Sequence, residues 1–309
     1  MTAFLIKRVI RGLITIWIII TVVFILLRSL GNPIDYLTIP QMSLEDRVRL
    51  KAHYGFDRPL IVQYGKFGKG IFTGDFGRSV NYSGRNALKV FNARVLATVQ
   101  LVGASLLFAM VVGLVLGMIS ATRPDSVVDY VIRLVAITGL AIPGFSLSLL
   151  FILLFSVYLR WLPSAGGPDR VGWIGLLMPA VTTGWYFVAA NTRLLRSAMM
   201  DALASDYITS TRARGVPNWA VLWKHAFKNA MIPVLTLFGV NFALLVGGAV
   251  IAETIFAWPG IGLLMVEATF ARDHAVIQVI IFFTATIIVA VNVFVDFCYA
   301  WIDPRIRLA

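Results

Sequence analysis

The sequence predicts an all-α integral membrane protein, and three observations lead to that prediction. The chain of 309 residues is 59% hydrophobic and only 14% charged, and its mean hydropathy of +0.85 is far above that of a soluble domain. Several apolar runs reach the roughly 20 residues that a helix needs to cross a bilayer. Because lipid cannot hydrogen-bond to backbone amides, such runs span the membrane as helices.

Six transmembrane helices are expected, with one long segment between the first two. The predicted spans are residues 9–29, 96–120, 132–157, 174–195, 231–252 and 275–300. The first span is not expected to be a cleavable signal peptide, because its apolar core is too long and no small-residue cleavage site follows it. The chain is therefore divided into a first part with the first helix (1–29), an extracytoplasmic segment (30–95), and a core of five helices (96–309) that includes the loop 196–230.

The positive charges predict that both termini are cytoplasmic. The presumptive inner segments 1–11, 121–133, 193–230 and 301–309 hold 13 Lys and Arg residues, whereas the two short outer loops hold three. The ten in 30–95 do not change this assignment, because segments of that length cross largely regardless of charge. The net charge of +12 thus reflects topology, and no soluble basic domain with clustered aromatics indicates nucleic-acid binding.

No catalytic residue, metal site or cofactor is predicted. The single Cys298 lies in the last span, and the three histidines fall in different segments without metal-ligand spacing. The glycine- and lysine-rich run 65–77 resembles a phosphate-binding loop, but Gln63 and Gly70 occupy positions where that motif needs Gly and Ser or Thr. The chain is therefore expected to be neither an enzyme nor an ATP-binding protein.

The ionisable residues of the spans indicate how transport would be driven. They lie near span ends, and no carboxylate is placed at mid-membrane; they are Arg28, Arg133, Arg193, Glu253 and Asp296. Ion-coupled carriers typically need a titratable group near the midplane. This argues against a secondary, ion-coupled solute carrier, which is the alternative function, and favours energy supplied by another polypeptide.

Prolines are expected to interrupt two spans. Pro143 and Pro179 each remove a backbone hydrogen bond from the third and fourth spans. Together with Gly144, Pro143 makes a candidate bend that lines the transport pathway. Ordinary helix packing through small residues explains the same pattern, and the sequence leaves both interpretations open.

The loop between the fourth and fifth spans is amphipathic and basic. Residues 206–233 read DYITSTRARGVPNWAVLWKHAFKNAMIP. Met200, Leu203, Tyr207 and Thr211 follow helical spacing. Gly215 suits the left-handed residue after a helix, and Pro217 the first turn of the next helix. In that second helix one face is expected to carry Trp219, Trp223 and Phe227, and another Lys224, His225 and Lys228. The pattern predicts a docking hairpin for a soluble partner or a pair of helices lying on anionic lipid.

The loop resembles the cytoplasmic coupling motif of ABC importer permeases, in which a glycine follows a short helix. Its ending, HAFKNAMIP (225–233), is similar to that of the oligopeptide, dipeptide and nickel permease family. Three other stretches match the first-type membrane subunit of that family: YGFDRPLIVQYGKFGKGIFTGDFGRSV (54–80), ETIFAWPGIG (253–262) and YAWIDPRIRL (299–308). RVLATVQL (94–101) and GNP (31–33) also fit in order along the chain. Thr209, Thr211 and Asn32 depart from the family's usual Arg, Ala and Asp.

The resemblance implies a function in the bacterial inner (cytoplasmic) membrane. A second homologous permease would complete the pore, two ABC ATPases would bind ATP and dock on the loop, and an extracytoplasmic binding protein would deliver the substrate. The expected ATPase contacts are Tyr207, Ala213, Arg214, Gly215 and Trp219. The segment 54–80 is a candidate contact for the binding protein or an outer gate. The family's cargoes include peptides, glutathione, nickel chelates, sugars and opines; peptide is the best single expectation.

Overall fold

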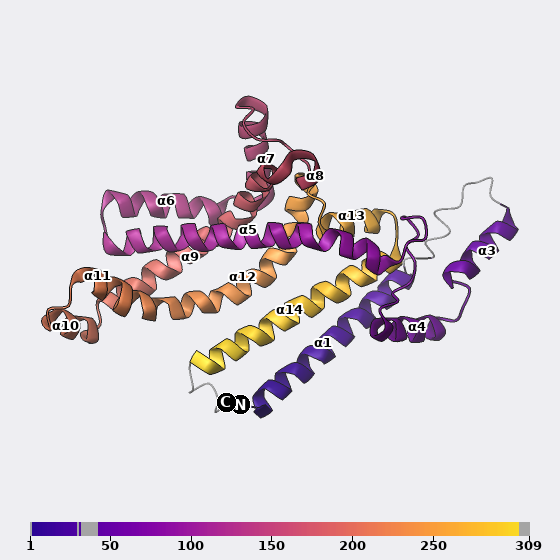
Figure 1. Ribbon diagram of the computed structural model, residues 1–309, viewed down its shortest axis with the longest axis horizontal. Helices are drawn as coiled ribbons and strands as arrows, with labels where there is room; N and C mark the ends of the chain where they lie inside the picture. The colour runs from indigo at the N-terminus through magenta and orange to yellow at the C-terminus, as the bar shows by residue number, and fades with distance from the viewer. Residues whose placement is uncertain (1, 30, 32–42, 303–309) are drawn as a thin grey trace. The chain divides into compact units, whose positions relative to one another are not determined.

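The computed structural model describes residues 2–29, 31 and 43–302, and these ranges are built of helices (Figure 1). Residues 32–33 of the GNP motif and residues 303–308 of the C-terminal motif lie outside the described residues. The chain forms two compact units. The first comprises the described residues up to Thr98 and from Pro259 onward, and the second is Val99–Trp258. The long helix α5 (Ala87–Thr122) contributes to both.

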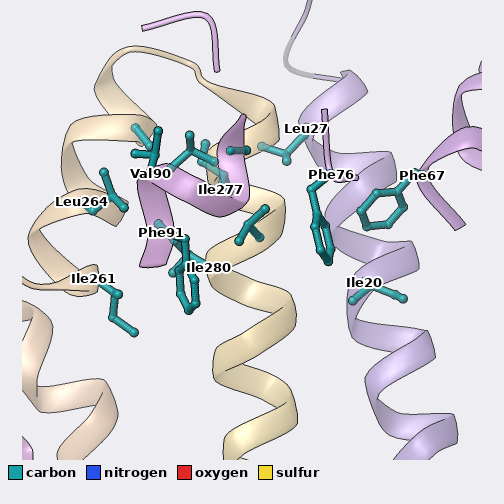
Figure 2. Packing of buried hydrophobic residues seen from close by; sticks show 14 of the residues in the cluster. Ile20, Leu27, Phe67, Phe76, Val90, Phe91, Ile261, Leu264, Ile277 and Ile280 are labelled. Atoms are coloured by element: carbon teal, nitrogen blue, oxygen red, sulfur yellow. The ribbon is translucent and has the colours of Figure 1, made fainter. Parts of the chain in front are cut away.

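The first unit is organised around two antiparallel helices, α1 (Thr2–Ser29) and α14 (His274–Ile302), which run side by side in Figure 1. The shorter helices α3 (Leu44–Tyr54), α4 (Leu60–Thr73) and α13 (Ile261–Phe270) complete it. Figure 2 shows the apolar core that joins α1, α4, α13 and α14 with the start of α5. Its labelled members are Ile20, Leu27, Phe67, Phe76, Val90, Phe91, Ile261, Leu264, Ile277 and Ile280.

Polar contacts attach the loop after α4 to the turn between α13 and α14. The buried carboxylate of Asp273 accepts hydrogen bonds from the Ser79 hydroxyl and, at 3.1 Å, from the Asn81 backbone amide. The hydroxyl of Tyr82 donates to Glu267 over 2.8 Å. Two segments almost 200 positions apart in the chain are therefore held together by buried or half-buried polar pairs.

The second unit is organised around helix α9 (Leu177–Leu203), which packs on α6 (Val127–Ala141), α7 (Gly144–Phe151) and α12 (Phe227–Ile255). Between α7 and α9 lie the π-helix η1 (Ile152–Tyr158), the short α8 (Pro168–Val171) and the 3₁₀-helix η2 (Gly172–Leu176). The side chains of α9 are buried around much of its circumference, as expected for a helix covered by neighbours on several sides.

Small and polar residues set the close packing of α5 against α9. A Cβ atom on Gly184 would come within 2.8 Å of the Ser105 carbonyl oxygen, so only glycine fits at that crossing. Asn191 and Thr192 donate across the interface to the carbonyls of Ala109 and Gly113, each over 3.3 Å. Interhelical hydrogen bonds of this kind hold helices together where lipid offers no hydrophobic driving force.

Among the described residues, four helices are long and apolar enough to cross a membrane, and a bent pair of helices makes a fifth candidate span. The four are Ile6–Ser29, Ala87–Thr122, Pro168–Leu203 and His274–Phe294, which agree with the predicted first, second, fourth and sixth spans. The bent pair, Val127–Ala141 and Gly144–Tyr158, coincides with the predicted third span. The predicted fifth span lies on α12, a continuous helix of 29 residues.

The predicted bend at Pro143 is present, and its angle is 107°. Ile142, the residue before the proline, is extended with φ −92° and ψ 120°, because the proline ring disfavours helical geometry at the preceding residue. In Figure 1, α7 turns sharply away from the line of α6. The prediction that Pro179 interrupts the fourth span is wrong: Pro179 lies in the first turn of α9, where its missing N–H removes no helical hydrogen bond.

Candidate functional site

The loop between α9 and α12 forms a short helix followed by a tight turn. Helix α9 ends at Leu203, and α10 (Asp206–Ala213) begins after its N-cap residue Ser205. The expected continuous stripe through Met200, Leu203, Tyr207 and Thr211 is therefore broken, since the first two residues lie on α9 and the last two on α10. The turn at Ala204 and Ser205 gives α10 an axis of its own.

Helix α10 is anchored by one side chain. Ile208 is fully buried and packs in an apolar group, here called the loop cluster, that comes from α5, α9, α10 and the start of α12. Its buried members are Ala121, Leu195, Met199, Ile208, Val221, Ala226, Ala230 and Val234. The remaining surface of α10 carries mostly exposed residues. A single inward-facing isoleucine thus joins an exposed helix to the interior of the second unit.

Gly215 ends α10 in the left-handed conformation that the sequence predicts, with φ +78°. Its amide donates to the carbonyl of Arg212 over 2.9 Å. An added Cβ would meet no atom within 4 Å, so the requirement for glycine here comes from the backbone conformation and not from crowding. Pro217 precedes α11 (Asn218–Ala220) as its N-cap residue, one position earlier than predicted.

The helix after the turn is wider than an α-helix. Residues Val221–Ala226 form the π-helix η3, which leads directly into α12. This wider turn brings residues five apart in sequence closer together, and the Lys224 ammonium lies 5.6 Å from the centre of the Trp219 ring. The predicted separation of tryptophans and lysines onto two faces is therefore wrong at this point. Trp219 remains 60% exposed and carries a positive charge beside its ring.

All five residues predicted to contact an ATPase lie at the exposed surface of this loop: Tyr207, Ala213, Arg214, Gly215 and Trp219. The hydroxyl of Tyr207 accepts a hydrogen bond of 2.8 Å from the Asn229 side chain, which joins α10 to α12. The segment from α10 to η3 (206–226), here called the α10 hairpin, is therefore held by the burial of Ile208 and by the hydrogen bond between Tyr207 and Asn229. Its exposed part carries two tryptophans, two arginines and a lysine, and a second exposed lysine follows at the start of α12: Trp219, Trp223, Arg212, Arg214, Lys224 and Lys228.

A buried ion pair lies beside the loop cluster, and the sequence analysis did not identify it. The carboxylate of Asp129, which is fully buried, accepts two hydrogen bonds from the Arg196 guanidinium, over 2.9 and 2.8 Å. It also accepts from the Ser120 hydroxyl and the Asp125 amide, and Arg133 lies 3.2 Å away. This network, here called the Asp129 network, joins α5, α6 and α9. Ser126-Val-Val-Asp129, an N-terminal capping pattern before an apolar run, was the available sequence signal.

Pro143 and Gly144, the predicted pathway residues, line a cavity of about 500 Å³ in the second unit. Its walls come from α6, α7, α9 and α12, and they include four aromatic residues that the sequence analysis did not select: Phe145, Trp185, Tyr186 and Phe187. On the polar side, the hydroxyl oxygens of Ser148 and Thr182 lie 3.1 Å apart, and the Ser148 hydroxyl lies 2.9 Å from the Gly144 carbonyl oxygen. The bend therefore does open onto a cavity, whereas its use as a transport path remains a prediction.

The glycine- and lysine-rich run 65–77 lies mostly inside helix α4. Phosphate-binding loops expose successive backbone amides before a helix begins, and in α4 those amides are engaged in helical hydrogen bonds. The structural context thus agrees with the rejection of a phosphate-binding loop from the residue spacing.

Long apolar helices with an exposed basic hairpin between α9 and α12 define a helical membrane protein. The MetNI methionine ABC transporter in inward facing conformations has a similar fold: the TM-score is 0.58 at 16% sequence identity, over 70% of this chain and 97% of that one. A likeness at this identity concerns the fold alone.

The chain belongs to the family of binding-protein-dependent transport system inner membrane components. The family model matches residues 113–308, and the model of the family's N-terminal part matches residues 1–91. The chain is 35% identical to the oligopeptide transport system permease protein AppB of Bacillus subtilis, over 99% of this chain and 100% of that protein. It is 33% identical to the glutathione transport system permease protein GsiC of Salmonella choleraesuis, over 99% of both. The chain is thus a multi-pass permease subunit of an ABC importer, as its motifs predict.

Proposed function

We propose that this chain forms a transmembrane pore with a second homologous permease subunit and is driven by two ABC ATPases, which dock on the cytoplasmic loops of the two permeases, in this chain on the α10 hairpin. An extracytoplasmic binding protein delivers the cargo. ATP is bound and hydrolysed in the partner subunits, and this chain conducts and couples. It crosses the membrane six times, with the bent pair as the third span and α12 as the fifth, and both termini are cytoplasmic.

The observation that carries the proposal is the contrast between the two sides of α10. One side chain, Ile208, is fully buried in the loop cluster, while Tyr207, Arg214 and the neighbouring Trp219 are exposed. Exposed aromatic and arginine side chains on a rigid helix are the groups that contribute most to protein interfaces. A partner that moves α10 therefore moves Ile208, and with it Leu195 and Met199 on α9.

Helix α9 extends from the loop cluster to the cavity. Leu195 and Met199 pack in the loop cluster, whereas Thr182 and Trp185, earlier on the same helix, line the cavity beside Pro143. Because α9 is a continuous helix of 27 residues, a displacement at one end is transmitted to the other. The Asp129 network connects this helix to α5 and α6, so the three helices respond together.

A di- or oligopeptide is the cargo that agrees best with the names of the relatives. AppB is named an oligopeptide permease, and GsiC is named a permease for glutathione, which is a tripeptide. Cargo choice in such importers is expected to lie mostly with the binding protein. The cavity in this chain therefore needs to fit peptides only in general: its aromatic walls would contact the side chains of the peptide, and the hydroxyls of Ser148 and Thr182 would contact the backbone of the peptide.

The test is co-purification of tagged chain with its ATPases, comparing wild type with Gly215→Glu. The substitution strains a left-handed residue and places a carboxylate in the docking surface, so ATPase recovery and ATP-dependent peptide uptake are expected to fall at least tenfold. Gly74→Glu is the matched control, because Gly74 also follows a helix in the left-handed conformation, with φ 74° and ψ 11°, and an added Cβ there would make only an ordinary contact of 3.8 Å with Leu88. Normal ATPase recovery and uptake in Gly215→Glu would contradict the proposal. Uptake in proteoliposomes without ATP would instead identify an ion-coupled carrier.

A further inference from the structure

The first unit contains a second cavity of about 500 Å³, and its lining is strongly basic. Four cationic side chains line it, from α1, α4 and the loop after α4, whereas Asp75 is the carboxylate that contributes to the lining; the cations are Arg28, Lys66, Lys69 and Arg78. His53 and His274 add two imidazoles. An excess of cations at one site lowers the energy of a bound anion.

Arg28 is arranged for an acceptor that the described residues do not provide. Its guanidinium lies 4.6 Å from the centre of the Phe56 ring and 5.2 Å from that of Phe24, and it donates to Nδ1 of His274 over 3.2 Å. Its Nε is buried without a hydrogen-bond partner, and among the described residues no carboxylate lies within ion-pair distance. A half-buried arginine without a counter-ion is costly unless an anion binds it.

Two further polar atoms at this cavity are unsatisfied. Gln278 is 5% exposed, and its Nε2 has no hydrogen-bond partner; Gln63 likewise leaves its buried Oε1 unpaired. Both side chains belong to the cavity lining. Buried amide groups in folded proteins are almost always hydrogen-bonded, so the free Nε2 donor of Gln278 and the free Nε of Arg28, which belong to residues lining the same cavity, indicate a missing acceptor.

The depth of the cavity indicates what the acceptor is. Arg28 lies in the last turn of the apolar span Ile6–Ser29, and His274 is the first residue of the apolar span His274–Phe294. The two span ends meet at one level, since Arg28 and His274 are hydrogen-bonded. Ends of apolar spans lie where hydrocarbon meets lipid headgroups. The cavity is therefore at headgroup level.

Helix α4 lies within the apolar depth next to this cavity. Its Tyr64 packs on Phe24 and Trp17 of α1 and hydrogen-bonds to Thr21, with 2.7 Å between the two oxygens. Trp17 is about 18 Å below Ser29 along the helix axis, at 1.5 Å per residue. The outward side of α4 exposes large apolar side chains, Ile61 and Phe72 among them. Such a helix, apolar outside and with lysines reaching toward the interface, lies in the lipid layer.

We infer that the basic cavity of the first unit binds the phosphate group of an anionic phospholipid, whose acyl chains lie along the exposed apolar side of α4. The phosphate oxygens accept from Arg28 and Gln278 at the base of the cavity. Lys69 and Arg78 at its exposed edge contribute charge. The lipid ties α4 to α1 and α14, and so fixes the segment between the first two spans.

The experiment measures phosphatidylglycerol retained by the full-length chain after extraction in mild detergent, by native mass spectrometry, with phosphatidylcholine as the neutral comparison. The cavity variant is Lys69→Gln/Arg78→Gln, and the matched control is Arg85→Gln/Lys89→Gln, which removes one arginine and one lysine from exposed positions outside the cavity. We expect the control to behave as wild type and the cavity variant to retain about 25-fold less phosphatidylglycerol, at about fivefold for each cation. Equal retention by all three proteins overturns the inference.

Two further arms identify the ligand. Gln278→Leu removes an unpaired buried amide, so it is expected to preserve or raise the melting temperature in phosphatidylcholine while lowering phosphatidylglycerol retention about fivefold. Unchanged retention in that variant contradicts the assigned phosphate position. Glycerol 3-phosphate at equal concentration tests for a soluble anion, and displacement of the lipid by it overturns the lipid assignment. Unchanged lipid retention, with weakened capture of the binding protein by the cavity variant, would assign the cavity to that protein instead.

Discussion

Replacement of Asp129 by asparagine tests whether the Asp129 network holds α6 and α9 together. The carboxylate is fully buried and accepts two hydrogen bonds from Arg196, one from Ser120 and one from the Asp125 amide. Asparagine is neutral and replaces one acceptor oxygen with a donor, so the Arg196 guanidinium loses its counter-ion. The side chain of Arg196 is only 19% exposed and water can satisfy little of it.

The expected cost follows from this geometry. Removing one partner of a buried ion pair destabilises a protein by about 3–5 kcal/mol. Because Arg133 is 37% exposed and can turn toward water, we expect the lower value, about 3 kcal/mol. Asp125→Asn is the control: that carboxylate is 83% exposed and lies 3.9 Å from Arg133, so its loss should cost at most about 1 kcal/mol.

The assay is thermal unfolding of detergent-solubilised protein, followed by fluorescence-detected size-exclusion chromatography. Asp129→Asn should lower the melting temperature by about 5 °C or more, and Asp125→Asn should leave it nearly unchanged. The double variant Asp129→Leu/Arg196→Met should recover much of the loss, because apolar residues of similar volume replace both charges. A melting temperature for Asp129→Asn equal to that of Asp125→Asn would refute the reasoning. Recovery of stability without recovery of peptide uptake would assign the network to coupling as well as to stability.

Three further predictions concern the hairpin and the bend. Ile208→Ala should cost about 2–5 kcal/mol and loosen α10, seen as faster hydrogen exchange confined to that helix; unchanged exchange would show that Ile208 is not the anchor. Gly215→Ala should cost about 1 kcal/mol from the left-handed backbone alone and weaken ATPase capture only slightly, so a loss as great as that of Gly215→Glu would contradict the role given to charge and size. Pro143→Ala restores a backbone N–H and should reduce the 107° angle, measured between spin labels on α6 and η1; an unchanged distance distribution would mean that neighbouring helices impose the bend.

The fold class and most spans could be predicted from the sequence, because both depend on local composition. An apolar run of about 20 residues has one stable state in lipid, whatever it packs against. The bend at Pro143 and the left-handed Gly215 are equally local, since each follows from the covalent structure of a single residue. The family motifs added the class of transporter, which composition alone would have left open.

The tertiary structure decided which polar residues meet. Asp129 and Arg196 are 67 positions apart, and Arg28 and His274 are 246 apart. No periodicity in the chain pairs them, because an ion pair between helices depends on their rotation and register. The sequence analysis therefore treated Arg28 and Arg196 only as charges near the membrane surface.

By itself the sequence determined that this protein is a helical membrane protein with an amphipathic loop whose first short helix ends at Gly215, because hydrophobicity and backbone geometry act within a few residues. Only the tertiary structure decided that Ile208 anchors α10 and that Pro143 opens onto a cavity. Both features depend on side chains from separate helices that pack against one another. Burial and close packing depend on how several segments fit together, so no single segment of the sequence determines them.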